Sequence, residues 1–285
     1  MFGLFGKKNK EEQVKVESPE FMQLVEKWDS FLNKMETRFN ESLVNAEEAL
    51  FDNLVESDYD LTPTMTAWQS IKSQLMDLGN KVDTTFDEKV KPQMLNYKEH
   101  YEILDQGAKA THLREKIIFK RLDRFEVVLE GKISSRFYNH AVKFLNEDFQ
   151  CTQCSAKIEL KKDIFHAHYV SCEYCNTVNT FKPNDKISAI RWIVDNIAKY
   201  KVITQWDLME QAREEFRNIR PPHEGQDSTE YTTAYKKRED TERAFWFKYF
   251  TERSEYLPDY KETIEHDMDN KMKWFYEERK RDLNY

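Results

Sequence analysis

The chain has 285 residues, of which 39% are hydrophobic, 34% charged and 14% aromatic, and its formal net charge is −8. The aromatic content excludes a disordered chain, because disordered sequences are poor in aromatic residues. Glycine and proline number only six and seven, which argues against a loop-rich β fold or a dinucleotide-binding α/β fold and favours long helices. No run of about 20 apolar residues occurs, so we expect no transmembrane segment. We also expect no signal peptide, because the apolar stretch at residues 1–6 is short and precedes its lysines.

Residues 1–17 are expected to form a flexible N-terminal tail. This tail places three apolar side chains before three lysines: Phe2, Leu4, Phe5, Lys7, Lys8 and Lys10. Such a segment could make weak contact with a membrane surface or dock on a partner, although so few apolar residues do not anchor a protein stably. The alternative is a frayed terminus without function.

Two long helices are predicted next. Ser18–Glu20 offers a capping hydroxyl, a proline at the first helical position and an acid in the first turn. The following apolar stripe comprises Phe21, Leu24, Trp28, Leu32, Met35, Phe39, Leu43, Ala46, Leu50 and Leu54. Its 11-residue repeat indicates a nearly straight helix, ending near residues 58–60, with a strongly acidic outer face. Thr62 and Pro63 begin the second helix, which Pro92 should kink or end. The short link predicts an antiparallel hairpin.

Helical character is expected to resume as far as about Leu104 and to break at Gln106 and Gly107. Residues 108–145 then carry more Lys and Arg than Asp and Glu, with Gly131 expected to separate two helices. The candidate contacts for nucleic acid or for an acidic partner are Arg114, Lys116, Lys120, Arg121 and Arg124. The alternative is that this basic helix packs beside the acidic first hairpin, which the acidic chain as a whole favours.

A further helix is expected to begin after residues 183–185 and to break near Lys201. A loop at residues 221–225 should precede two helices, over about 228–255 and 259–282, that Leu257 and Pro258 separate. The first of these is unusually aromatic, and its candidate partner-binding face comprises Tyr231, Tyr235, Phe245, Trp246, Tyr249 and Phe250. The alternative is a helix that is buried on two sides.

All four cysteines fall in two C-x-x-C pairs, Cys151 with Cys154 and Cys172 with Cys175, and 17 residues lie between the pairs. This spacing is within the roughly 15–20 residues typical of four-cysteine zinc sites. A structural Zn²⁺ ion takes four ligands in a tetrahedron, at about 2.3 Å from sulfur. Four thiolates fill that shell, so we expect one structural zinc ion with no open position for a substrate.

The segments around the pairs are rich in strand-forming residues. Three strands are predicted, over 157–160, 165–170 and 177–181. The order of cysteine knuckles and strands, in residues 149–181 only, resembles that of a zinc ribbon. Zinc ribbons and rubredoxins usually carry glycine directly after each pair, where the backbone turns left-handed. Ser155 and Asn176 occupy these positions here, which weakens a rubredoxin-like iron site more than a zinc site.

Two other uses of these residues remain open. The pairs could be redox disulfides, but a thioredoxin-type C-x-x-C opens a helix after a strand, and neither pair does so. Four paired cysteines with none left over also suit a reducing compartment. His166 and His168 could replace a cysteine ligand or form a second metal site, or they could be half-exposed strand residues.

Motifs of common enzymes are missing from the sequence. It contains no G-x-x-x-x-G-K-[ST] or G-x-G-x-x-G phosphate loop, no H-E-x-x-H and no G-x-S-x-G. A di-iron bundle would need Glu-x-x-His on two helices, and no histidine here has Glu three residues before it. We therefore expect no enzymatic activity and identify no small-molecule substrate.

Taken together, the sequence predicts a mainly α protein of long antiparallel helices, bundle-like or coiled-coil-like, with a small inserted β zinc ribbon. The predicted regions are the tail at 1–17, a helical region at 18–147, the zinc ribbon at 148–184 and a C-terminal helical region at 185–285 that packs with the first. The favoured function is a non-enzymatic cytoplasmic scaffold or adaptor that binds a protein partner or a second copy of itself. The alternatives are an accessory protein associated with nucleic acid, which the acidic chain disfavours, and a peripheral membrane assembly factor that uses the N-terminal tail.

Overall fold

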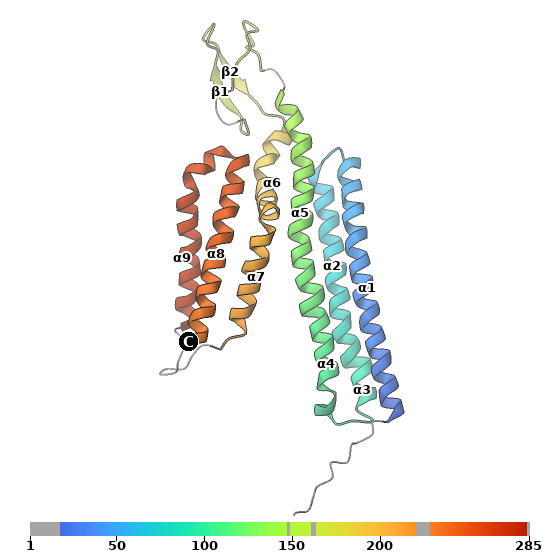
Figure 1. Cartoon of the computed structure of the whole chain (residues 1–285). Coiled ribbons are helices and arrows are strands. Elements are labelled where there is room, and N and C mark those ends of the chain that lie inside the picture. The colour runs from blue at the N-terminus through green and yellow to red at the C-terminus, as the bar shows by residue number, and fades with distance from the viewer. Residues whose placement is uncertain (1–17, 147–148, 161–163, 221–228, 284–285) are drawn as a thin grey trace, which may run out of the picture. The chain divides into compact units, whose positions relative to one another are not determined.

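The computed structural model describes residues 18–146, 149–160, 164–220 and 229–283, and it confirms a mainly α chain with a small two-stranded sheet (Figure 1). The predicted tail at 1–17 and the predicted loop at 221–225 lie outside the described residues. Contacts divide the chain into two compact units. The first combines Met1–Glu48 with Ala67–Leu122, and the second combines Ala49–Thr66 with Asp123–Tyr285.

The helical elements follow the predicted order, with several short π or 3₁₀ segments (η) between the α-helices. In chain order the elements are α1 (Pro19–Glu56), α2 (Leu61–Thr85), η1 (Phe86–Val90), α3 (Lys91–Met94), η2 (His100–Ile103), α4 (Leu104–Thr111), η3 (His112–Phe119), α5 (Lys120–Ala141), η4 (Val142–Asn146), β1 (His168–Ser171), β2 (Val178–Phe181), α6 (Asp185–Lys201), α7 (Ile203–Arg217), α8 (Thr229–Tyr256), η5 (Pro258–Thr263) and α9 (Ile264–Leu283). Among the described residues, none of these helices is long and apolar enough to cross a membrane.

The predicted starts of the first two helices are close to those observed. The Ser18 hydroxyl accepts a hydrogen bond from the Phe21 N–H at 3.1 Å, as expected of a capping serine. At α2 the carboxylate of Asp60 accepts from the Thr62 N–H at 2.9 Å, so Asp60 caps this helix in place of Thr62. The α-helical pattern of α2 ends at Thr85 and gives way to the π-helical η1, and Pro92 lies in the first turn of α3.

The apolar stripe of α1 forms the core of the first unit. Its buried members in this unit are Phe21, Trp28, Leu32, Met35, Phe39 and Ala46. The Trp28 ring lies 5.5 Å from the Phe86 ring, and its indole N–H donates to the Gln106 carbonyl oxygen at 3.1 Å. This pair of contacts ties α1 to both η1 and α4.

The predicted break at Gln106 and Gly107 is wrong, because α4 runs through both residues. Gly107 instead permits a close approach: a Cβ atom at this position would lie 2.9 Å from Cε1 of the Phe86 ring. A glycine that is needed for contact with a neighbouring element looks, in the sequence, the same as a glycine that ends a helix.

The same correction applies to Gly131, which lies inside the continuous helix α5. In the second unit this residue faces α6. A Cβ atom here would collide with Cβ of Tyr200 and lie 3.0 Å from the Asn196 carbonyl oxygen. The glycine therefore lets α5 and α6, which flank the cysteine region in sequence, pack backbone against backbone. Nearby, Phe137 and Ala141 of α5 share a buried cluster with Ile187 and Ile190 of α6.

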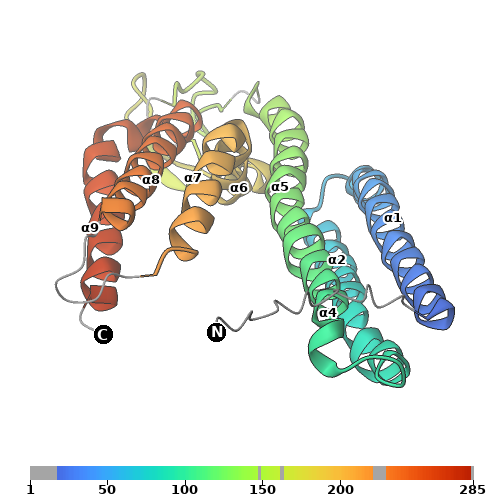
Figure 2. The same cartoon turned by 60° about the horizontal axis from the view of Figure 1, so that its bottom comes forward.

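The aromatic helix α8 is buried on two sides. It packs against α6, α7 and α9, and Figures 1 and 2 both show it between α7 and α9. Five members of the predicted partner face are buried: Tyr231, Tyr235, Phe245, Tyr249 and Phe250. Phe245, Tyr249 and Phe250 belong to one cluster with Ala198 and Met209, while Tyr235 belongs to another with Met272 and Phe275. These contacts support the alternative of two-sided burial, and the sixth member, Trp246, is half-buried.

An ion pair with a buried carboxylate lies within these C-terminal helices. Glu242 of α8 is 3% exposed, and its carboxylate accepts from Nε of Arg213 at 2.6 Å and from the indole N–H of Trp246 at 3.1 Å. Both carboxylate oxygens are therefore hydrogen-bonded, as a charge in this environment requires.

We predict that Gly131→Ala destabilises the protein by about 1–2 kcal/mol, because overpacking at the α5–α6 contact outweighs the higher helix propensity of alanine. Gly79→Ala in α2 is the matched control. Its Cβ atom would meet Cε1 of Phe119 at 2.8 Å, and this ring edge can move aside. Urea unfolding of the two variants measures the difference, and equal stability of both would contradict the close approach at Gly131.

Candidate metal centre

Each cysteine pair lies in a tight turn, here called a knuckle, whose shape is fixed by two backbone hydrogen bonds. In the first knuckle the Cys151 N–H donates to the Ala156 carbonyl oxygen at 2.8 Å, and the Ser155 N–H donates to the Cys151 carbonyl oxygen at 3.0 Å. Ser155 has a φ of 58°, so the backbone turns left-handed directly after the pair. The bonds return the chain toward its starting point, so both sulfurs of the pair lie on one side of the turn.

The second knuckle repeats this geometry. The Cys172 N–H donates to the Thr177 carbonyl oxygen at 2.9 Å, and the Asn176 N–H donates to the Cys172 carbonyl oxygen at 2.9 Å. Asn176 has a φ of 56°. The left-handed conformation therefore occurs at the two positions where related knuckles carry glycine, although serine and asparagine occupy them here.

The knuckles bring the four sulfur atoms together. All four Sγ atoms lie within 4.8 Å of one another, and this is a group that could hold a metal ion. Across the knuckles, Cys151 Sγ is 3.5 Å from Cys175 Sγ, and Cys154 Sγ is 3.6 Å from Cys172 Sγ. These distances are far longer than the roughly 2.05 Å of a disulfide bond, and all four cysteines are free. The arrangement is therefore consistent with a set of metal ligands.

Electrostatics make a cation necessary if all four sulfurs are to be ionised. Hydrogen bonds from the backbone N–H groups of Cys154 and Gln153 lower the pKa of Cys151 to about 6. The Ala156 N–H favours the thiolate of Cys154, but Cys175, burial and the two other cysteines outweigh it and raise the pKa of Cys154 to about 12. One sulfur thus ionises readily while another resists, as expected of like charges at close range. A bound cation removes this conflict.

Asn179 supports the first knuckle and was missed in the sequence. Its side chain is 2% exposed. The side-chain oxygen accepts from both the N–H and the hydroxyl of Thr152, each at 2.9 Å. The side-chain nitrogen lies 3.6 Å from Cys151 Sγ and donates to the Thr177 carbonyl oxygen at 2.9 Å. One amide therefore connects both knuckles to a ligand sulfur. The signal in the sequence was a polar residue on the inward side of a predicted strand, two positions before Phe181.

The sheet beside the knuckles is smaller than predicted. Strands β1 and β2 form an antiparallel hairpin in which His168 pairs with Phe181 and Ser171 pairs with Val178. The strand predicted over 165–170 begins only at His168. In place of the strand predicted over 157–160, the described residues there make a single bridge, between Gln150 and Lys157. Backbone hydrogen bonds of the first knuckle, rather than a third strand, hold this segment in place.

The two histidines of this region do not join the sulfur cluster. His168 packs against Phe181, with ring centroids 5.3 Å apart, and His166 lies 3.4 Å from the Arg191 guanidinium. His168 is therefore a half-buried strand residue, as in the simpler alternative, whereas His166 is exposed and precedes β1.

The predicted basic contacts are distributed over both units. Within the first unit, Arg114 pairs with Asp83 of α2, and Arg121 pairs with Glu36 of α1 at 3.0 Å. Within the second unit, Arg124 binds both carboxylate oxygens of Asp207, at 2.8 and 3.0 Å. Lys116 and Lys120 are exposed. For Arg114 and Arg121, these pairs support the alternative in which the basic stretch packs against the acidic hairpin.

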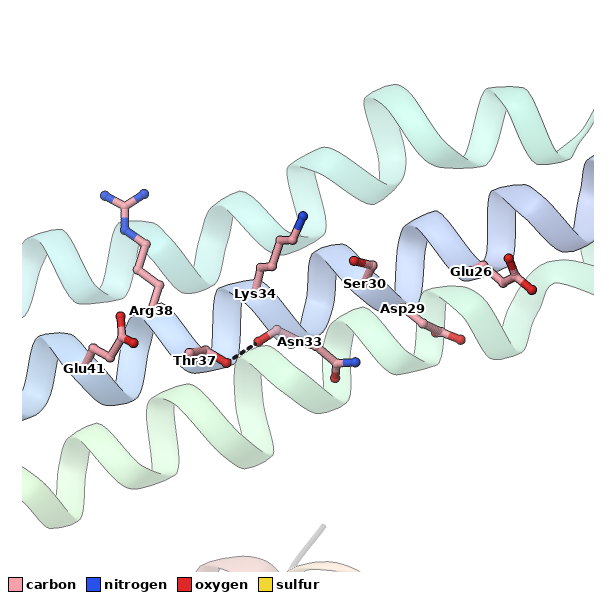
Figure 3. A pocket seen from close by; sticks show the side chains of 8 residues that line it. All are labelled: Glu26, Asp29, Ser30, Asn33, Lys34, Thr37, Arg38 and Glu41. Carbon is pink, nitrogen blue, oxygen red and sulfur yellow. Dashed lines mark hydrogen bonds between the residues drawn. The ribbon is translucent and has the colours of Figure 1, made fainter.

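A hollow of about 570 Å³ runs along α1 (Figure 3), and eight polar residues of this one helix line it, from Glu26 to Glu41. The side chains stand on successive turns and do not point toward a common centre. The Thr37 hydroxyl donates to the Asn33 carbonyl oxygen at 2.9 Å, within the helix. This arrangement describes the polar face of a helix, and we assign no chemistry to it.

Comparison with known proteins gave no match to a family model, to a curated protein or to a solved structure. The assignment of the metal centre therefore rests on its own geometry.

We predict that Cys154→Ser removes the bound metal, about one ion per chain, and loosens residues 149–181, because one of four ligands is lost. Elemental analysis measures the metal content, and hydrogen exchange measures the loosening. Ser155→Gly is the matched control and should keep the metal, because glycine readily adopts the left-handed backbone of this position. Unchanged metal content in Cys154→Ser would contradict the assignment.

We predict that Asn179→Ala lowers the metal affinity by roughly 10–100-fold, the usual effect of removing a residue that orients a ligand. Competition with a chromogenic chelator measures the affinity. Thr180→Ala, a change to an exposed side chain of the same strand, should leave it unchanged. Equal affinities of the two variants would show that Asn179 has no part in holding Cys151.

Proposed function

We propose that the metal is zinc and that its role is structural. Four sulfurs placed about 2.3 Å from one tetrahedral ion would be roughly 3.8 Å apart, close to the 3.5 and 3.6 Å between the sulfurs across the knuckles. A complete shell of four thiolates leaves no position for water or substrate, which supports a non-enzymatic protein. Free cysteines throughout support a reducing compartment such as the cytoplasm.

We further propose that the protein is a scaffold or adaptor that binds a protein partner through the outer face of the β1–β2 hairpin. The observation that carries this proposal is the exposure of large side chains on this small module. Tyr169 of β1 and Tyr174 of the second knuckle are each 79% exposed, and Val178 of β2 is 62% exposed. Zinc-ribbon modules have little apolar core of their own, so side chains of this size left in solvent need a reason.

The chemistry of this face favours a protein as the partner. Tyr169 pairs across the sheet with Thr180, and Val178 pairs with Ser171, so both cross-strand pairs are uncharged. Tyrosines that lie on a rigid backbone give large contact area at low entropic cost and are frequent hot spots of protein interfaces. An uncharged face offers no electrostatic attraction to the phosphates of nucleic acid. On the inner face of the same hairpin, Val170 packs against the cysteine cluster and the Asn179 amide contacts Cys151.

The two alternative functions have less support. Arg114, Arg121 and Arg124 already pair with carboxylates of the chain, which reduces their attraction for nucleic acid. The proposed membrane contact depends on Phe2, Leu4 and Phe5, which lie outside the described residues.

We predict that the double variant Tyr169→Ala/Tyr174→Ala loses its specific protein partner in affinity purification from the native host. Hot-spot residues contribute about 2 kcal/mol each, so recovery should fall by more than about tenfold. Tyr97→Ala/Tyr101→Ala is the matched control, since these tyrosines are 47% and 69% exposed and lie in the first unit. Quantitative mass spectrometry compares the three proteins, with metal content checked in each.

Three outcomes would decide between the functions. A protein that is lost only with the hairpin variant supports the adaptor. Partners retained equally by the hairpin variant and the control would show that this face is not the docking site. Recovery that disappears after nuclease treatment would support the nucleic-acid alternative instead.

A further inference from the structure

The connection between α1 and α2 has an unusual backbone. Asp58 and Tyr59 are consecutive residues with φ values of 52° and 59°. Aspartate enters the left-handed region at some cost, and a bulky tyrosine does so rarely. Such a conformation persists only where the surrounding structure holds it. The contacts of this turn therefore show what fixes it.

Two side chains of the second unit hold the turn. The Tyr59 ring stacks on the His140 ring of α5, with centroids 3.9 Å apart and planes 11° from parallel. Lys186 of α6 donates to the Asp58 carboxylate at 2.9 Å and also to the Asp58 carbonyl oxygen. Lys186 thus binds Asp58, and His140 stacks on Tyr59. We call these four residues the turn latch.

The latch requires a neutral histidine. Nζ of Lys186 lies 3.4 Å from Nε2 of His140. An ammonium group can only donate hydrogen bonds, so the Nε2 atom that faces it must carry a lone pair and the ring proton must be on Nδ1. Protonation of the ring would place a second cation beside the ammonium group and would remove the acceptor.

The charges around His140 act in both directions. Burial lowers the pKa of His140 from its ordinary value of 6.5, and Lys186 of α6 and Lys143 of η4 lower it further, while Asp58 of the turn raises it. The other rings in contact with His140 are those of Tyr59 and Phe144. The neutral form is therefore favoured in the folded latch. Its contribution to stability is fully present above pH 6.5 and is lost as the pH falls through the lowered pKa of His140.

We propose that the turn latch is a pH-sensitive fastening, which holds the α1–α2 turn on α5 and α6 while His140 is neutral and releases it when His140 is protonated. A cavity of about 390 Å³, lined by Ser57–Thr62, Phe137 and Lys186 among others, lies beside the turn and gives it room to move. On release, Asp58 and Tyr59 can return to ordinary backbone conformations. The turn latch depends neither on a bound metal nor on the adaptor function.

Hydrogen exchange in the full chain tests the release directly. The Tyr59 N–H donates to the Leu54 carbonyl oxygen at 2.8 Å in the latched turn, so its protection reports on the latch. After correction for the intrinsic effect of pH, protection of residues 54–62 should fall several-fold between pH 7.5 and 5.5. His140→Phe keeps an aromatic ring for the stack but cannot be protonated, and it should abolish this fall.

Two controls and one alternative measurement keep the outcome interpretable. His112→Phe makes the same change at an exposed histidine of η3 and should keep the response. The Cys154→Ser variant, with its expected loss of metal, separates acid release of the metal, which should affect residues 149–181, from release of the turn. If His140→Phe does not fold, a nuclear magnetic resonance titration of the wild-type ring replaces it. His140 should then titrate below pH 6.5, and the Tyr59 ring signals should shift at the same midpoint.

Protection of residues 54–62 that does not change with pH would overturn the proposal. So would a pH response that survives in His140→Phe, or a His140 that titrates at or above its ordinary value.

Discussion

The close spacing of four cysteine sulfurs is the constraint on which the middle of this chain depends. Two knuckles with the same backbone hydrogen bonds bring the sulfurs within 4.8 Å of one another. The Asn179 amide then adds contacts from the neighbouring strand. Such a group is stable with all sulfurs ionised only around a cation. In the proposed zinc site, metal binding would be coupled to the folding of this region and would make the hairpin rigid.

Much of the fold could be predicted from local patterns. The apolar stripe of α1, the cap at Ser18, the start of α6 and the break near Lys201 all appear close to their expected positions. The cysteine cluster followed from spacing alone. These features are local, because a few neighbouring residues determine them.

The features that could not be predicted depend on residues far apart in the sequence. Gly107 and Gly131 resemble helix breaks until the Phe86 ring and Tyr200 are seen against them. The turn latch joins Tyr59 to His140 and Asp58 to Lys186, and no pattern in the sequence links residues so far apart. Likewise, a charged stretch gives no indication of whether its partners lie in the same chain or in another. For Arg114 and Arg121 they lie in the same chain.

The two-sided burial of α8 has a consequence for the order in which the protein is made. Synthesis proceeds from the N-terminus, so α8 leaves the ribosome after α6 and α7 but before α9. Tyr235 can contact Phe216 of α7 at once, whereas Met272 and Phe275 arrive only with the last helix. During this interval one aromatic side of α8 is in water and open to non-native contacts. Until α9 has been translated, the side of α8 that carries Tyr235 therefore exposes apolar surface of the kind that chaperones bind.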